Sequence, residues 1–176
     1  MSDQKFPKRM GTQSHGDTEE SERRREVLYT FEGGADGAEP TAALVWDKKQ
    51  QFLYGSTAGG GAPGLGTVFK LAGNGSESVL YAFQNGGDAE EPTANLIWDS
   101  KQRSLYSTAL GGGGNGLGAI FKIGTTGKET VLYSFTNGGD SEQPRAGLTW
   151  GRGGRLYGTA TGGGAEGLGT VLEVNP

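Results

Sequence analysis

The sequence predicts an all-β protein, a β-propeller made of three four-stranded blade repeats. One observation is a motif, VLYxF, that occurs at 27–31, 79–83 and 131–135, with successive copies 52 residues apart. Repetition at such a period is typical of repeat architectures. A second observation is that short apolar runs alternate with Gly-rich or polar turns, and no segment has a helical period. Four short antiparallel strands in a unit of about 40–50 residues are typical of a propeller blade.

Each strand of the first repeat is predicted from its own pattern. An apolar run, AALVW at 42–46, predicts a strand that is buried on both faces. After a polar turn, FLYGST at 52–57 predicts a second strand, and the Gly-rich loop at 59–66 separates it from a third, TVFKL at 67–71. VLYAF at 79–83 is the fourth strand, with alternate side chains on one face. We name these positions strands a, b, c and d, from the predicted axis to the rim.

The other two repeats follow the same order, but the third stops after strand c. Their predicted strands are 94–98, 104–108, 119–123 and 131–135, then 146–150, 155–159 and 170–174. VLYTF at 27–31 is then a strand d without a blade of its own. Propellers typically have 4–8 blades, and joining such a strand to an incomplete blade would protect a sheet edge. We therefore expect a homodimer that completes one six-bladed ring by strand-swapped closure; the alternatives are a fragment of a longer array or a three-bladed unit.

Residues 1–26 are predicted to be a disordered N-terminal tail, followed by one propeller domain at 27–176. The tail is highly charged and has few apolar residues, so it cannot bury enough surface to order itself. No hydrophobic segment follows Lys8 and Arg9, and the tail is therefore not interpreted as a signal peptide. The predicted repeats of the domain are 27–78, 79–130 and 131–176.

The composition excludes several kinds of site and partner. There is no cysteine, which rules out disulfides and thiolate metal sites, and the single histidine, His15, lies in the tail. A Ser–His–Asp triad or a multi-histidine metal site inside the repeats is therefore excluded. The formal net charge of −4 argues against a nucleic-acid partner. No apolar run approaches the ~20 residues of a membrane span, so we expect no membrane partner either.

Long motifs within the repeats resemble a known family. They are LYGSTAGGGAPGLGTVFKL at 53–71, LYSTALGGGGNGLGAIFKI at 105–123 and LYGTATGGGAEGLGTVLEV at 156–174, each preceded by VLYxF and a Gly–Asp loop that ends in proline. This pattern is similar to the GloVer tandem repeats of bacterial proteins. The resemblance implies a propeller-like repeat protein without an established activity, either secreted or attached to the cell surface. Because no signal peptide is recognised, the location stays open between secreted and cytoplasmic.

The predicted d–a and b–c loops share one end of each blade, and this end is acidic. Loops on a rigid scaffold are common binding sites. The candidate ligand-binding residues are Asp36, Glu39, Asp88, Glu91, Asp140 and Gln143. Their oxygens can coordinate Ca²⁺ or accept hydrogen bonds from sugar hydroxyls; no other cofactor and no other metal is predicted. For the three aspartates the favoured alternative is an Asx-type turn, in which the carboxylate caps backbone N–H groups.

Two other repeated features have both a structural and a functional interpretation. Trp46, Trp98 and Trp150 end equivalent strands and are expected to pack between adjacent blades; the alternative is an aromatic platform for sugars. The Gly-rich loops are expected to be tight b–c connections. A dinucleotide-binding loop needs a helix after its glycines, whereas here a strand follows.

The leading functional hypothesis is a non-catalytic binding or scaffold module that uses the acidic loop face. A lectin-like propeller with one weak sugar site in each blade is the alternative. A glycosidase with an Asp/Glu pair ranks third, because similar loops in every repeat argue against one specialised catalytic site. The sequence therefore predicts that the chain is not an enzyme. Its expected partners are a second copy of itself and a protein or carbohydrate ligand.

Overall fold

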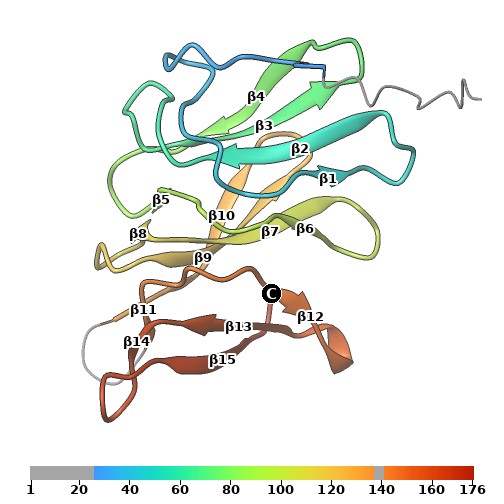
Figure 1. The fold of residues 1–176 in the computed structure, drawn as a ribbon. Coiled ribbons are helices and arrows are strands. Elements are labelled where there is room, and N and C mark those ends of the chain that lie inside the picture. The colour runs from blue at the N-terminus through green and yellow to red at the C-terminus, as the bar shows by residue number, and fades with distance from the viewer. Residues whose placement is uncertain (1–25, 137–140) are drawn as a thin grey trace, which may run out of the picture.

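Three antiparallel sheets of three or four strands are stacked one on another in the part of the chain that the structure describes (Figure 1). The computed structural model describes residues 26–136 and 141–176. The strands of the first sheet, in spatial order, are β1 (Val45–Trp46), β2 (Phe52–Thr57), β3 (Thr67–Ala72) and β4 (Glu77–Ala82). Those of the second are β6 (Ile97–Trp98), β7 (Ser104–Ala109), β9 (Ala119–Gly124) and β10 (Glu129–Ser134). Those of the third are β12 (Thr149–Trp150), β13 (Leu156–Ala160) and β15 (Thr170–Val174), with a short 3₁₀ turn, η1 (Arg152–Gly154), before β13.

The strand register repeats from one sheet to the next. In the first sheet β2 pairs with β3 from Phe52 opposite Ala72 to Thr57 opposite Thr67. In the second sheet β7 pairs with β9 over the equivalent positions, from Ser104 opposite Gly124. The outer pairs, β3 with β4 and β9 with β10, each contain a register shift, which is the irregularity expected of a β-bulge. The predicted order of four, four and three strands is confirmed.

The core lies between the sheets, where apolar side chains of successive repeats meet. Phe83, directly after β4, packs edge-to-face on Phe121 of β9, with ring centroids 5.1 Å apart. Both rings are buried, and Val68 and Leu105 belong to the same cluster. Burial of such side chains contributes about 1.5–3 kcal/mol each, so contact between the sheets is a large contribution to stability. One sheet alone would leave these side chains in water.

Two-stranded ladders connect the loops at one end of the stack, on the left in Figure 1. They pair β5 (Ala89–Glu90) with β8 (Gly111–Gly112) and β11 (Ser141–Glu142) with β14 (Gly162–Gly163). Gly112 has φ +73°, and a Cβ at that residue would lie 2.1 Å from the carbonyl oxygen of Asp88, so only glycine fits. The d–a and b–c loops therefore share one end of the sheets, and the Gly-rich loops are tight connections, as predicted.

Two strand predictions need correction. The segment 27–31 is not a strand, although its Tyr29 and Phe31 side chains pack against the first sheet. A strand needs a neighbouring backbone for its ladder, and within residues 26–136 and 141–176 no strand lies beside this segment. Strand a is also shorter than predicted, two residues rather than five in each repeat. Side chains bind the backbone ahead of it instead: Ala43 N–H donates to Asn95 Oδ1 at 2.8 Å.

The architecture is thus all-β, and the described residues include no α-helix. None of their helical turns is long and apolar enough to cross a membrane. Closure into a ring stays a prediction. The predicted disordered tail at 1–26 lies almost entirely outside the described residues.

Candidate aromatic site

A ladder of tryptophans links the three sheets at the end opposite the Gly-rich loops. Trp46, Trp98 and Trp150 are the last residues of β1, β6 and β12. The Nε1–H of Trp98 donates to the carbonyl oxygen of Trp46 at 2.9 Å, and that of Trp150 donates to the carbonyl oxygen of Trp98 at 2.7 Å. The indole N–H is a donor only, so each bond fixes the orientation of its ring.

Tyrosines of the neighbouring repeat support the same rings. Tyr54 on β2 contacts Trp98 edge-on, with centroids 4.9 Å apart, and Tyr106 on β7 contacts Trp150 at 5.1 Å. Such edge-to-face pairs contribute about 0.5–1.5 kcal/mol beyond simple burial. The prediction that these tryptophans pack between adjacent sheets is confirmed for Trp98 and Trp150, whereas Trp46, on the first sheet, is 45% exposed.

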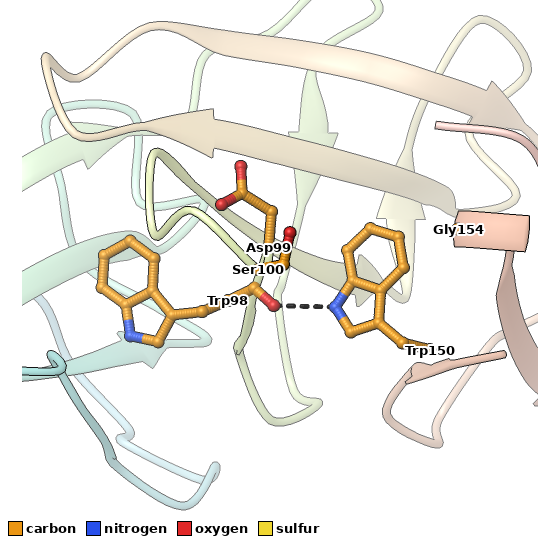
Figure 2. A pocket seen from close by; sticks show the side chains of 5 residues that line it. All are labelled: Trp98, Asp99, Ser100, Trp150 and Gly154. Carbon is orange, nitrogen blue, oxygen red and sulfur yellow. Dashed lines mark hydrogen bonds between the residues drawn. The ribbon is translucent and has the colours of Figure 1, made fainter.

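A recess of about 340 Å³ lies between Trp98 and Trp150 (Figure 2). Its other lining residues are Asp99, Ser100 and Gly154, which belong to the a–b turns of the second and third repeats. Asp99 Oδ1 accepts the backbone N–H of Lys101 at 2.9 Å and that of Arg103 at 3.0 Å, which holds the carboxylate in place. The recess therefore combines two aromatic rings with a hydroxyl and a carboxylate.

A second recess, of about 400 Å³, lies between the first and second sheets and also uses Trp98. Tyr54 contributes another ring, and Lys48, Lys49 and Lys101 are three cations on its lining, against one carboxylate, Asp47. The two a–b turns are tied together here, because Lys48 N–H donates to Gln102 Oε1 at 2.6 Å. Trp98 thus separates a more basic recess from a more neutral one.

This arrangement fits ligands that have both apolar and polar faces. The faces of sugar rings stack on indole rings. Turn hydroxyls can donate hydrogen bonds to sugar hydroxyls or accept them, and carboxylates accept them. Lysine ammonium groups bind a carboxylate as point charges. The chemistry available at this end of the sheets is therefore stacking on aromatic rings, hydrogen bonding to turn groups and, in the recess lined by Lys48, Lys49 and Lys101, pairing with an anion.

The acidic loops place two of their predicted site residues in turns rather than toward solvent. Asp36 Oδ2 accepts the backbone N–H of Glu32 at 2.7 Å and the hydroxyl of Tyr29 at 3.0 Å. These hydrogen bonds, the one from Glu32 above all, hold the pKa of Asp36 below its usual range. Burial and the hydrogen bond to Asp36 raise the pKa of Tyr29 to about 12.

Asp88 repeats this geometry one period later. Its Oδ2 accepts the hydroxyl of Tyr81 at 2.8 Å and the N–H of Gln84 at 2.7 Å. Burial, followed by the bond to Asp88, raises the pKa of Tyr81. This is the capping geometry that the sequence favoured for the aspartates.

The remaining predicted site residues are spread along the same loop end. Glu39, Glu91 and Gln143 are exposed and have φ values of +58°, +53° and +51°. Their backbone carbonyls anchor the b–c loops; for example, Ala58 N–H donates to the Glu39 carbonyl oxygen at 3.0 Å. Asp140 lies outside the described residues. A ligand-binding role for these side chains stays a prediction.

Sequence reasoning missed two glutamates at equivalent positions of the first two sheets. Glu77 begins β4 and Glu129 begins β10, and each has one buried carboxyl oxygen without a hydrogen-bond partner among the described residues. Burial, and then the charge and hydrogen bond of Asp88, raise the pKa of Glu129 to about 8. Burial, followed by the charge of Asp36, also raises the pKa of Glu77. Their exact recurrence at the 52-residue period is the signal that could have identified them.

Within residues 26–136 and 141–176, no three His, Cys, Asp or Glu side chains form a group that could hold a metal ion. Glu129 contacts Asp88 as a pair, without a third acidic partner. Calcium binding by the acidic loops stays a prediction.

The chain belongs to the Gloeobacter/Verrucomicrobia repeat family, whose model matches residues 10–176. The resemblance seen in the repeated motifs is thereby confirmed, and the match extends into the N-terminal tail. A comparison with functionally curated proteins finds no match.

Among solved structures, the chain is similar to XC5397 of Xanthomonas campestris, a gluconolactonase, with 18% identity and a TM-score of 0.52. The similarity covers 81% of this chain and 46% of the enzyme, so the chain spans about half of the enzyme's length. The fold of that enzyme is of the six-bladed propeller type. The prediction that the chain is not an enzyme is contradicted by this comparison, since an enzyme uses the same fold. Similarity among the repeats was too weak a reason to exclude catalysis.

Proposed function

We propose that this protein is a carbohydrate-binding propeller module, with its site at the two recesses that share Trp98. The observation that carries the proposal is the position of Trp98 and Trp150 on the lining of one recess, each held by an indole hydrogen bond and a tyrosine. Preformed aromatic walls with a few polar groups are typical of ligand sites. The acidic loop face is the weaker candidate, because the Asp36 and Asp88 carboxylates already bind tyrosine hydroxyls.

The lysines of the more basic recess define the class of sugar. Lys48, Lys49 and Lys101 outnumber the single aspartate on its lining. A sugar acid, such as an aldonic or uronic acid, offers a carboxylate to these cations and ring or chain hydroxyls to the turns. We therefore expect acidic sugars to bind more tightly than their neutral counterparts.

Tryptophan fluorescence tests this proposal, because Trp98 lines both recesses. Gluconate and glucuronate should change the emission saturably, and glucose should bind more weakly. Lys101→Ala should weaken binding of the acids roughly tenfold, as expected for loss of about 1.4 kcal/mol. Lys128→Ala is the matched control, since Lys128 is an exposed lysine in the second repeat and does not line either recess. No saturable response to any acidic or neutral sugar would reject the proposal.

A second candidate function is hydrolysis of a sugar lactone, which the fold of the gluconolactonase favours. Water would add to the lactone carbonyl, the ring ester C–O bond would break, and a carboxylate, a hydroxyl and a proton would be released. The residues to examine are Asp88 and Glu129, because burial, followed by the charge and hydrogen bond of Asp88, raises the pKa of Glu129 to about 8, which suits a general acid.

A pH-stat assay with δ-gluconolactone, with and without divalent cations, tests this candidate. Catalysis would appear as a rate above that of buffer, and Glu129→Gln should abolish it if the pair takes part. A rate equal to that of buffer under all conditions would reject hydrolysis of this substrate and leave sugar binding as a separate question.

A further inference from the structure

The outer side of the first sheet exposes a position that the other two sheets bury. Leu44, Leu96 and Leu148 are equivalent residues ahead of strand a. Leu96 and Leu148 are 2% and 5% exposed, whereas Leu44 is 48% exposed. The difference arises because Leu96 and Leu148 face a preceding sheet and Leu44 does not.

The outer side of the third sheet shows the complementary difference. Val68, Ile120 and Val171 are equivalent residues of strand c. Val68 and Ile120 are each 0% exposed, while Val171 is 81% exposed. Leu168 in the adjoining b–c loop is exposed as well. The surface that covers a following sheet in the first two repeats is therefore unpartnered in the third.

The contacts between sheets show which surface fits Val171. Val68 lies in one cluster with Phe83, Leu96 and Phe121 of the following repeat. Ile120 lies in the next cluster with Phe135 and Leu148. One period earlier the same positions are Phe31, Leu44 and Phe69, and these three residues line an apolar recess of about 410 Å³ on the first sheet.

Polar groups follow the same rule. Ser56 and Thr108 are buried, and their hydroxyls donate to the carbonyl oxygens of Pro92 and Pro144 in the following repeat. The equivalent donor in the third sheet, Thr159, is exposed, and the equivalent acceptor residue, Pro40, lines the recess on the first sheet. The indole N–H groups of Trp98 and Trp150 each donate to the carbonyl oxygen of the tryptophan one repeat earlier. Within the described residues, no tryptophan precedes Trp46, so its indole N–H has no equivalent acceptor.

We propose that the occupant of these two surfaces is a second copy of this chain. Val171 of each copy packs against Phe31, Leu44 and Phe69 of the other, and the Trp46 indole of each copy donates to the Trp150 carbonyl oxygen of the other. The pair is closed by a two-fold axis and leaves neither surface exposed. The similarity to about half of a six-bladed propeller supports this closure, because two such halves complete one ring.

A second copy fits better than an unrelated partner because both surfaces belong to one repeating design. The residues exposed on one surface are equivalent to residues that, at the two junctions inside the chain, contact the equivalents of residues on the other surface. Contiguous apolar surface of this kind is unfavourable in water and marks an interaction site. This inference is independent of the proposed sugar site, whose lining residues come from one chain.

Light scattering after gel filtration tests the inference on the 1–176 chain. The wild-type protein should have twice the 18.3 kDa mass of one chain. Val171→Arg and Leu44→Arg change opposite surfaces, and each alone should reduce the mass to that of one chain, because every contact uses both. Thr130→Arg is the matched control: Thr130 is an exposed strand residue of the middle sheet, and the variant should remain a dimer.

Circular dichroism of the same variants separates dissociation from misfolding. A folded Val171→Arg monomer supports the inference. A wild-type mass of one chain, or a series of larger open assemblies, would overturn it. Loss of the dimer in only one of the two surface variants would also overturn it, because that result indicates pairing of one surface with itself.

Discussion

The junction between the first and second sheets and the outer side of the first sheet have nearly the same residues in different surroundings. At the junction, Phe83 is fully buried against Phe121. At the outer side, Phe31 makes the equivalent contact with Phe69, at a centroid distance of 5.0 Å, but is only partly buried. The contact between the rings is therefore a property of one repeat, while burial of the rings depends on the preceding sheet.

The same comparison holds for the acidic residues near each ring pair. Tyr81, Asp88 and Glu129 at the junction correspond to Tyr29, Asp36 and Glu77 at the outer side. The pKa of Glu129 is raised to about 8, mainly by burial, and that of Glu77 is raised by the same cause. The size of the pKa shift of the glutamate in this repeated motif thus depends on how deeply the surrounding protein buries it.

The largest expected effect is the loss of a junction ring. Phe83→Ala should lower the free energy of unfolding by about 3–5 kcal/mol, because it removes a buried ring and leaves a cavity. Phe31→Ala should cost less than half as much, since this ring is only partly buried. Urea unfolding in the Val171→Arg background, which removes any contribution from a second copy, measures both. Equal costs would show that burial does not distinguish the two sites.

The second prediction concerns pH and Glu129. Its pKa in the folded protein, about 8, lies above the ordinary value of 4.5, so the folded state retains a proton that the unfolded state has lost. The resulting stabilisation is fully present below pH ~4.5 and is lost as the pH rises toward 8. Glu129→Gln should remove this dependence, and the variant should gain stability relative to wild type as the pH rises through this range.

Glu77→Gln is the matched control for the pH experiment. It should change the dependence in the same direction but by less, because Glu77 lies at the more open side. Unfolding free energies measured from pH 4 to pH 9 for both variants test this comparison. An unchanged pH profile in Glu129→Gln would mean that Glu129 does not retain a proton in the folded protein.

The 52-residue period made most of the strands predictable, because the same alternation of apolar and turn residues occurs in all three repeats. The prediction for 170–174 coincides with β15 (Thr170–Val174). The length of strand a was overestimated. Nothing in AALVW shows that the Asn95 side chain binds the backbone of this segment, in the preceding repeat. The prediction of a strand at 27–31 was wrong, because a strand forms only beside a neighbouring strand, and the sequence of the segment does not show whether one is present.

The candidate site was harder to predict, because it is formed between repeats. Trp98 and Trp150 were recognised as packing residues, and only the spatial arrangement shows that they also line a recess with Asp99 and Ser100. The Asp88–Glu129 pair joins the loop ahead of the second sheet to β10 at the outer edge of that sheet, and the two residues lie at opposite ends of the repeat 79–130. Contacts across a repeat boundary are visible from sequence only when the register of stacking is known.

The smallest expected effect is the loss of a hydroxyl at the sheet boundaries. Thr108 is buried, and its Oγ1 donates to the Pro144 and Ala146 carbonyl oxygens at 3.3 and 3.1 Å. Thr108→Val keeps the shape but leaves buried carbonyls without a donor, which should cost about 1–2 kcal/mol. Thr159→Val, at the exposed equivalent position, should cost almost nothing in the Val171→Arg monomer and a measurable amount in the dimer, where a second copy would cover Thr159. Urea unfolding in both backgrounds compares the two, and an equally small cost for Thr159→Val in the dimer would contradict the placement of Thr159 at a boundary between copies.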